Sequence, residues 1–397
     1  MMNDVDDEVD EENEIIELER RRQERLEFRR QIESNDPSLL RADIGSYSYI
    51  PHDGDWGEFG ASIGRNTFIE TVYIDIGYIS QGDFESFVRG FALNRSVQLL
   101  TICCGSRDYT GETLGELLPF FMKNPAFKSL RVEYANPTCL RALASILQQF
   151  DTLAEFTLYD LEKHDDDHFD EYGELIDEFN DCEDFSVAVT EVIQALAGHS
   201  SLTKLSIEQS IAEGWQYRKI LMNGWESLTG LLRKSSSSLM VLELDDTPMD
   251  NLGAYILAAG ILVNTSLKEF ALYCTHMTKD GWDAIFAALK RSTCTVEKLR
   301  VCMIRRIEDD VLSSISNALL DRGILKSLCL DGYGEYIPSA TVANRGALFQ
   351  LLHNPMCALE ILHLNTVGLN MIQLFFLEMS LQIIAGSRNF GWTVIVM

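Results

Sequence analysis

A pattern of apolar positions recurs along the chain. Leu239-Met-Val-Leu-Glu-Leu244 has the form L-x-x-L-x-L, and nine further segments repeat it with other apolar residues allowed. The fourth position falls at residues 72, 100, 130, 156, 205, 242, 270, 299, 328 and 362, in steps of 28, 30, 26, 49, 37, 28, 29, 29 and 34. Because most steps lie near 28 or 29, these segments are structural repeats rather than chance apolar clusters.

Each segment predicts a short strand, because its last two apolar residues are two positions apart and share one side. The stretches between strands carry apolar residues three and four apart, which predicts helices at 112–122, 251–263 and 310–320. In 251–263 the residues expected to share a buried face are Leu252, Ile256, Leu257, Gly260 and Ile261. Thr278 is the expected N-cap of another helix. One strand–helix unit cannot bury its own apolar face, but stacked units share a continuous core.

The segment 247–272 shows the full repeat. It combines Asp250-Asn-Leu-Gly253, Leu257-Ala-Ala and Asn264-Thr-Ser-Leu-Lys-Glu-Phe-Ala-Leu272, and so resembles a leucine-rich repeat of the ribonuclease-inhibitor-like family. The resemblance covers about residues 55–397. It implies an α/β fold: a leucine-rich-repeat solenoid (horseshoe) with a parallel concave β-sheet, convex helices and about ten repeats. It says little about activity.

The ends and one insertion depart from the repeat. Residues 1–34 form an acidic, arginine-rich arm with a helix expected over Glu14–Glu33, either solvated or docked as a cap on the first repeat. Residues 35–397 are expected to be the solenoid, interrupted at 159–184 by a segment with 13 acidic residues and one lysine that should loop out. Phe390–Val396 predicts a final edge strand.

The formal net charge of −28 bears on the partner. Nucleic acid and anionic membranes are disfavoured, because both are bound mainly through lysine and arginine. A protein partner with a basic surface is favoured, since opposite charge speeds encounter. The chain is expected to be a monomer.

Cysteine usage indicates a reducing compartment. The nine cysteines are odd in number and form no CxxC pair. The first residues show no secretory signal, and no apolar run of about 18 residues occurs. A cytoplasmic location is expected, with the nucleus as the alternative. The N-x-S/T sequons at Asn94 and Asn264 are therefore expected to stay unmodified.

Motifs for catalysis and cofactors are missing from the sequence. It contains no G-x-x-x-x-G-K-[ST], no G-x-S-x-G and no H-E-x-x-H, so neither an enzyme nor a cofactor is predicted. Gly332-Tyr-Gly334 is interpreted as a loop. Cys103 is expected on the exposed side of its strand and Cys104 in the turn, both as idle thiols.

The acidic insertion invites a test for metal binding. His164 and His168 are four residues apart among aspartates, which are hard oxygen ligands. The EF-hand register fails, because Gly173 at loop position six puts His168 at position one and Phe179 at position twelve. A solvated charged loop is expected, and no metal site.

The concave sheet is the expected binding surface, because solenoids of this type bind through it. Residues at offsets −1, +1 and +3 from the fourth apolar position should line it. Tyrosine and arginine are frequent interface anchors. The candidate protein-binding residues are Tyr73, Arg131, Tyr159, Glu208, Glu243, Asp245, Tyr273 and Arg300. Of these, Glu208, Glu243, Asp245 and Tyr273 form the preferred contact patch.

These observations favour a non-catalytic protein–protein interaction scaffold. Two alternatives stay open. One is a GTPase-activating protein of the Ran-activator type, which the chain resembles in its repeat type and in having an acidic segment, and whose functional loop arginine would correspond to Arg107 after the second strand. The other alternative is an acidic chaperone or inhibitor of a basic protein.

Overall fold

The computed structural model describes residues 4–45, 55–104, 114–115, 118–119, 124–149, 152–159, 179–208, 220–234, 237–245, 247, 249–273, 277–291, 293–303, 309–319, 323–332, 358–365 and 393–396. The chain divides into two compact units, Met1–Glu133 and Tyr134–Met397. Each unit is described by itself.

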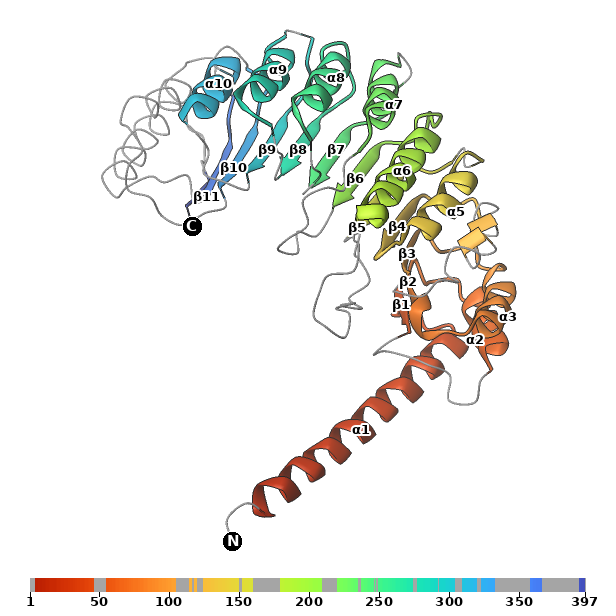
Figure 1. The fold of residues 1–397 in the computed structure, drawn as a ribbon. Helices are drawn as coiled ribbons and strands as arrows, with labels where there is room; N and C mark the ends of the chain where they lie inside the picture. Colours follow the sequence, from red (N-terminus) through yellow and green to blue (C-terminus); the bar gives the residue numbers. More distant parts are fainter. Residues whose placement is uncertain are drawn as a thin grey trace. The chain divides into compact units, whose positions relative to one another are not determined.

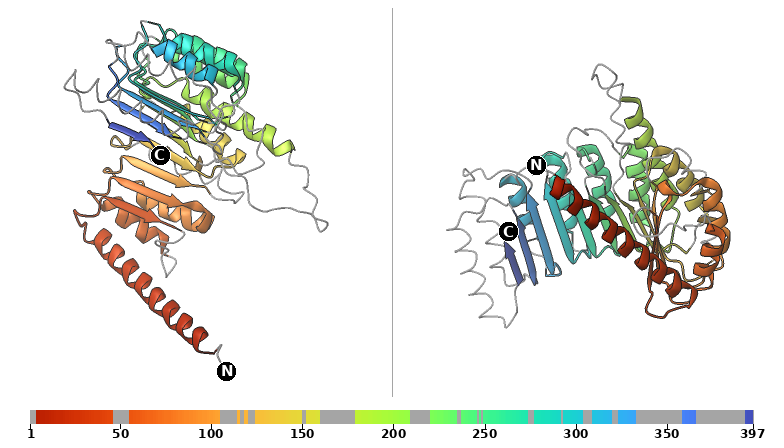
Figure 2. Two further views of the ribbon diagram at one scale, coloured as in Figure 1. Left: turned by 90° about the vertical axis from the view of Figure 1, so that its left-hand side faces the viewer. Right: turned by 90° about the horizontal axis from the view of Figure 1, so that it is seen from below.

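The first unit is built on four parallel strands in chain order (Figure 1). The strands are β1 (Arg41–Ile44), β2 (Thr71–Asp75), β3 (Leu99–Cys103) and β4 (Ser129–Glu133). The helices are α1 (Asp4–Glu33), α2 (Trp56–Arg65), the 3-10 turn η1 (Ile76–Tyr78) and α3 (Gln81–Phe91). Helices α2 and α3 cover one face of the sheet, and none of the helices described in this unit covers the other face (Figure 2).

The second unit continues the same plan with eight described strands, again parallel and in chain order. The strands are β5 (Glu155–Tyr159), β6 (Lys204–Glu208), β7 (Val241–Asp245), β8 (Glu269–Tyr273), β9 (Lys298–Met303), β10 (Ser327–Gly332), β11 (Ile361–Asn365) and β12 (Thr393–Val396). The helices are α5 (Pro137–Leu147), α6 (Phe179–Leu196), α7 (Met222–Arg233), α8 (Asn251–Ile261), α9 (Lys279–Leu289) and α10 (Asp309–Leu319).

All ten predicted strands are present, and their fourth apolar residues pair with one another. Val72 aligns with Leu100 in the first unit, and Leu242 with Phe270 in the second. These residues are buried and form the core between sheet and helices. The alternation of parallel strands and helices confirms the α/β leucine-rich-repeat solenoid.

Two strands lie outside the ten repeats. The C-terminal edge strand is confirmed as β12, which pairs with β11. Strand β1 is not among the predicted strands, although Leu39-Leu-Arg-Ala-Asp-Ile44 follows the same pattern with a small residue, Ala42, at the fourth position. Because alanine contributes little to an apolar pattern, the first repeat is hidden in the sequence.

The predicted helices at 251–263 and 310–320 correspond to α8 and α10, and the described residues between 114 and 119 are helical. The predicted buried face of α8 is partly wrong. Leu257 and Ile261 are buried, but Leu252 is 53% exposed. The helix is apolar on every side, so periodicity cannot distinguish its inner face from its outer face.

Helices α2 and α3 approach each other through glycines. A Cβ atom on Gly60 would lie 2.1 Å from the carbonyl oxygen of Phe87, and one on Gly90 would lie 2.2 Å from the amide nitrogen of Ala61. The rings of Trp56 and Phe87 pack edge to face beside this contact. The glycines therefore set the spacing between the first two helices.

Buried asparagines join successive repeats at the turn between helix and strand. The side-chain nitrogen of Asn94 donates to the carbonyls of Ile63 and Asn66, and its oxygen accepts from two amides of its own turn, those of Ser96 and Val97. Asn264 does the same, donating to Leu232 O. The two sequons thus mark structural asparagines.

The N-terminal arm is a longer helix than predicted, since α1 begins at Asp4 rather than Glu14. Acidic residues near a helix N-terminus interact favourably with the helix dipole, which explains the early start. Near the other end of α1, Ile32 is buried, and Arg29 pairs with Glu58 of α2. Ile16 and Leu26 are exposed.

The acidic insertion is shorter than predicted. Strand β5 ends at Tyr159 and α6 begins at Phe179, so residues 179–184 are helical rather than looped out. Arg141 of α5 pairs with Asp184 and holds this first part of α6. Residues 160–178, including His164 and His168, lie outside the described residues.

Two smaller predictions also change. Gly332 is the last residue of β10 rather than part of a loop, and Gly334 lies outside the described residues. Thr278 is the N-cap of α9, but its side chain makes no cap hydrogen bond. Its hydroxyl instead accepts from Asn251 Nδ2 of the preceding repeat at 2.7 Å.

Candidate protein-binding face

The open face of the sheet carries the predicted rows in the predicted register. In the second unit the +1 row places neighbours in the order Thr157, Ser206, Glu243, Ala271, Arg300, Cys329 and His363. In the first unit the row is Asp43, Tyr73, Thr101 and Arg131. The candidate residues of each unit are therefore on one face, and their role in binding stays a prediction.

The carboxyl ends of the second unit's strands gather the acidic part of the preferred patch. Glu208 ends β6 directly beside Asp245, which ends β7, and both are half-buried. Tyr273 ends β8 and Tyr159 ends β5. Two adjacent carboxylates on a sheet face favour a cationic group of a ligand.

Arg300 and Tyr273 form one composite element. The guanidinium carbon lies 5.7 Å from the centroid of the tyrosine ring, within range of a cation–π interaction. In the row, only the buried Ala271 stands between Glu243 and Arg300. Glu243 and Arg300 are two strand spacings apart, about 10 Å. The face therefore presents an acidic and a basic side chain on either side of a small alanine.

Glu243 is already engaged within the face. Its carboxylate lies 2.9 Å from the ammonium of Lys204 on the neighbouring strand β6. A cationic group of a partner would have to compete with Lys204 for this carboxylate.

In the first unit the candidate residues are also tied into local contacts. Arg131 Nε lies 2.6 Å from Glu133, and the Tyr73 hydroxyl bonds to the Cys103 thiol. Burial, together with that bond, raises the pKa of Tyr73 far above its usual range. Cys103 is buried rather than exposed, as is Cys104, so neither thiol is presented to solvent.

A ladder of charges at the amino ends of the strands is not among the sequence predictions. The carboxylate of Glu297 lies 2.9 Å from Lys268 and 2.6 Å from Lys326, and Lys298 pairs with Glu269. The hydrogen bonds from Lys326 and Lys268 lower the pKa of Glu297 to about 2. The sequence signal for this ladder is the alternation of charge at Lys268, Glu297 and Lys326, each two residues before the fourth apolar position of its repeat. This offset of −2 is not one of the offsets expected to line the binding face.

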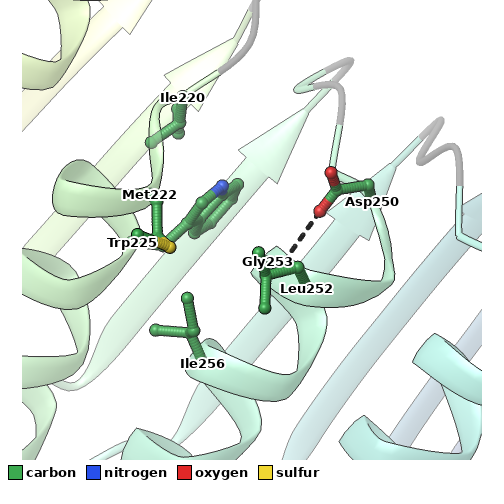
Figure 3. Close-up of a pocket in the computed structure, with 7 residues that line it drawn as sticks. All are labelled: Ile220, Met222, Trp225, Asp250, Leu252, Gly253 and Ile256. Carbon is green, nitrogen blue, oxygen red and sulfur yellow. Dashed lines mark hydrogen bonds between the residues drawn. The ribbon is translucent and has the colours of Figure 1, made fainter.

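A small pocket lies on the opposite, helical side, between α7 and α8. Its volume is about 60 Å³, and Ile220, Met222, Trp225, Asp250, Leu252, Gly253 and Ile256 line it (Figure 3). Asp250 caps α8 by accepting a 2.9 Å hydrogen bond from Gly253 N. The volume suits one or two water molecules rather than a cofactor.

Other predicted sites receive no support or lie elsewhere. Among the described residues, no group of three His, Cys, Asp or Glu side chains could hold a metal ion. Within the same part of the chain, no helix has the length and apolar character needed to cross a bilayer. Arg107, which the alternative reading compares with the Ran activator's arginine, lies outside the described residues.

Comparison with known proteins adds little. No protein-family model matches the chain. No curated protein matches its sequence. Among solved structures, the chain is similar to one in the crystal structure of the yeast Rad7 and Elc1 complex, with a TM-score of 0.45 and 12% identity over 98% of this chain and 91% of that one. A TM-score below 0.5 is too low to support an inference about partner or activity.

Proposed function

We propose that the protein is a non-catalytic interaction scaffold that binds another protein on the open face of its parallel sheet. The observation that carries the proposal is the group formed by Glu208, Asp245 and Tyr273 at the ends of three successive strands and by Arg300 in the middle of the next strand. It combines two carboxylates with a tyrosine and an arginine, the residue types that anchor protein interfaces. These side chains stand on rigid strands, which keeps the entropy cost of binding low.

The partner is proposed to carry a basic surface. The chain has a formal charge of −28, and Glu208 and Asp245 on adjacent strands add two carboxylates to this face. Charge complementarity of this kind raises the association rate and weakens with salt. The ribonuclease-inhibitor-like subclass is proposed from the repeat sequence alone.

The test compares two triple variants of the full chain, each of which loses two carboxylate charges and one aromatic ring. Glu208→Gln, Asp245→Asn and Tyr273→Ala alter the sheet face. The control variant carries Glu19→Gln, Glu33→Gln and Phe68→Ala at exposed positions away from this face. Each variant and the wild type are immobilised, and proteins captured from a cell lysate are quantified by mass spectrometry.

We expect the sheet-face variant to capture specific basic proteins at least tenfold less than the wild type, while the control variant captures them equally well. Thermal unfolding should be the same for all three chains, because the altered side chains lie outside the core. Equal capture by the sheet-face variant and the wild type would refute this placement of the binding site.

A further inference from the structure

Helix α8 has an unusual composition for its position. It is the only described α-helix without a charged residue, with the sequence Asn-Leu-Gly-Ala-Tyr-Ile-Leu-Ala-Ala-Gly-Ile. Its outward side is nevertheless accessible, since Leu252 is 53% and Tyr255 49% exposed, as is Val263 (53%) in the turn that follows the helix. A helix that is apolar all round is normally buried on all sides. The exposed apolar outer face of α8 therefore indicates a contact surface for another protein.

The two neighbouring helices frame this apolar strip with charges. Helices α7, α8 and α9 lie side by side (Figure 1). On α7 the exposed residues include Glu226 near the start and Arg233 at the end. On α9 they include Lys279 and Asp280 at the start, and Lys290 and Arg291 follow the end; Lys279 pairs with Asp283 of the same helix. Apart from that neutral pair, both flanks are acidic at the amino end and basic at the carboxyl end.

The same face carries small residues about one turn beyond the exposed Tyr255. Gly230 on α7, Ala259 on α8 and Ala287 on α9 stand at corresponding levels, and a Cβ atom on Gly230 would meet open space. Small residues at this level let another helix approach closely. The face therefore has room for an apolar ridge, with charged side chains beyond it on both sides.

We propose that this α7–α9 face binds a second copy of the chain through an antiparallel α8–α8 contact about a two-fold axis. An apolar strip with opposite charges at its two ends is complementary to itself after such a rotation. Leu252 then meets Val263 of the second copy, and Ile256 meets the small Ala259. Glu226 meets Arg233 of the second copy, and Asp280 meets Arg291.

The spacing of these residues supports the common axis. The pairs Glu226–Arg233, Leu252–Val263 and Asp280–Arg291 are centred at 229.5, 257.5 and 285.5. These centres lie 7.5, 6.5 and 6.5 residues after the helix starts at 222, 251 and 279. All three pairs are thus centred at the same level to within one residue, about 1.5 Å along a helix. A single rotation satisfies the three pairs together.

The pocket between α7 and α8 adds a shape argument. Leu252, Ile256 and Met222 line its rim (Figure 3). In the antiparallel arrangement, Val263 of the second copy arrives over Leu252, beside this hollow. The sequence alone predicts a monomer, because it offers no sign of where α8 is exposed. The contact of one helix with its copy is small, so we expect a weak dimer that dissociates on dilution.

The first experiment is sedimentation equilibrium of the full chain over a wide concentration range. We expect a monomer–dimer equilibrium. Tyr255→Glu should raise the dissociation constant at least tenfold, because it places a charge in the centre of the contact. Met240→Glu changes another exposed apolar residue away from this face and should leave the constant unchanged. A monomer at every concentration, or equal effects of the two variants, would overturn the proposal.

A charge exchange tests the two-fold geometry without relying on the apolar centre. Glu226→Arg with Asp280→Arg makes both ends of the flanks basic, and Arg233→Glu with Arg291→Glu makes both ends acidic. Each variant alone should be monomeric, while a mixture of the two should form a heterodimer at low salt. If the mixture associates no better than either chain alone, the antiparallel pairing is wrong. Circular dichroism verifies that every variant is folded.

Discussion

The guanidinium of Arg300 lies over the ring of Tyr273, 5.7 Å from its centroid, and so couples the end of β8 to the middle of β9. The tyrosine ends its strand, and the arginine stands one row further back on the next strand. The stack holds both side chains in one orientation, so that a ligand meets a preformed surface rather than two mobile groups.

A double-mutant cycle should detect this stack. Tyr273→Leu removes the ring face, and Arg300→Gln removes the charge. We expect a coupling free energy of about 0.5–1 kcal/mol, the usual range for a cation–π pair at an exposed site. Urea denaturation of the four proteins measures it. Strictly additive effects would show that the two side chains do not interact in solution.

The glycine contact between α2 and α3 predicts opposite effects for two similar substitutions. Gly60→Ala adds a methyl group where the Phe87 carbonyl oxygen lies, so it should destabilise the chain by about 1–3 kcal/mol or more. Gly82→Ala is the control, because a Cβ atom there has nothing within 4 Å. It should stabilise α3 by about 0.5 kcal/mol through helix propensity. Thermal unfolding compares them, and a neutral Gly60→Ala would contradict the close approach.

The buried asparagines should matter more than surface ones. Asn94→Ala leaves the carbonyls of Ile63 and Asn66 and two amides without their partner, which should cost about 1–3 kcal/mol. Asn317→Ala, on the exposed side of α10, should change stability by less than about 0.5 kcal/mol. Chemical denaturation of both variants measures the difference. Similar costs would argue against the inter-repeat bonds.

Glu297 should titrate at unusually low pH. Its pKa is lowered from 4.5 to about 2, mainly by the hydrogen bond from Lys326. A carboxyl with a lowered folded pKa adds stability above its unfolded pKa, and this stability is lost as the pH falls from about 4.5 towards 2. Lys326→Met should return the pKa part of the way to 4.5. Carbon-13 NMR of the Glu297 carboxyl reports it, and an unchanged pKa in this variant would exclude the ion pair.

The repeats can be predicted because each strand needs apolar residues at fixed positions. The spacing of about 28 or 29 residues between equivalent positions does not depend on which residues occupy the surface. That pattern by itself predicts that Glu243, Ala271 and Arg300 share one row. It cannot reveal that Lys204 binds Glu243, since side chains on adjacent strands choose partners by reach and geometry. The pattern also cannot show which side of α8 is buried, because Leu252 and Leu257 are the same residue type and both fit the apolar pattern of the helix.

The asparagine bonds between repeats bear on where the chain can fold. Asn94 and Asn264 both occupy N-x-S/T sequons, yet their amide nitrogens are buried and donate to the preceding repeat. Attachment of a sugar to either nitrogen would remove donor capacity and place a bulky polar group inside the stack. Synthesis in a compartment that glycosylates nascent chains would therefore separate two pairs of repeats before they could close. Glycosylation of Asn94 and Asn264, the two residues that join these repeats, would therefore prevent the repeats from stacking.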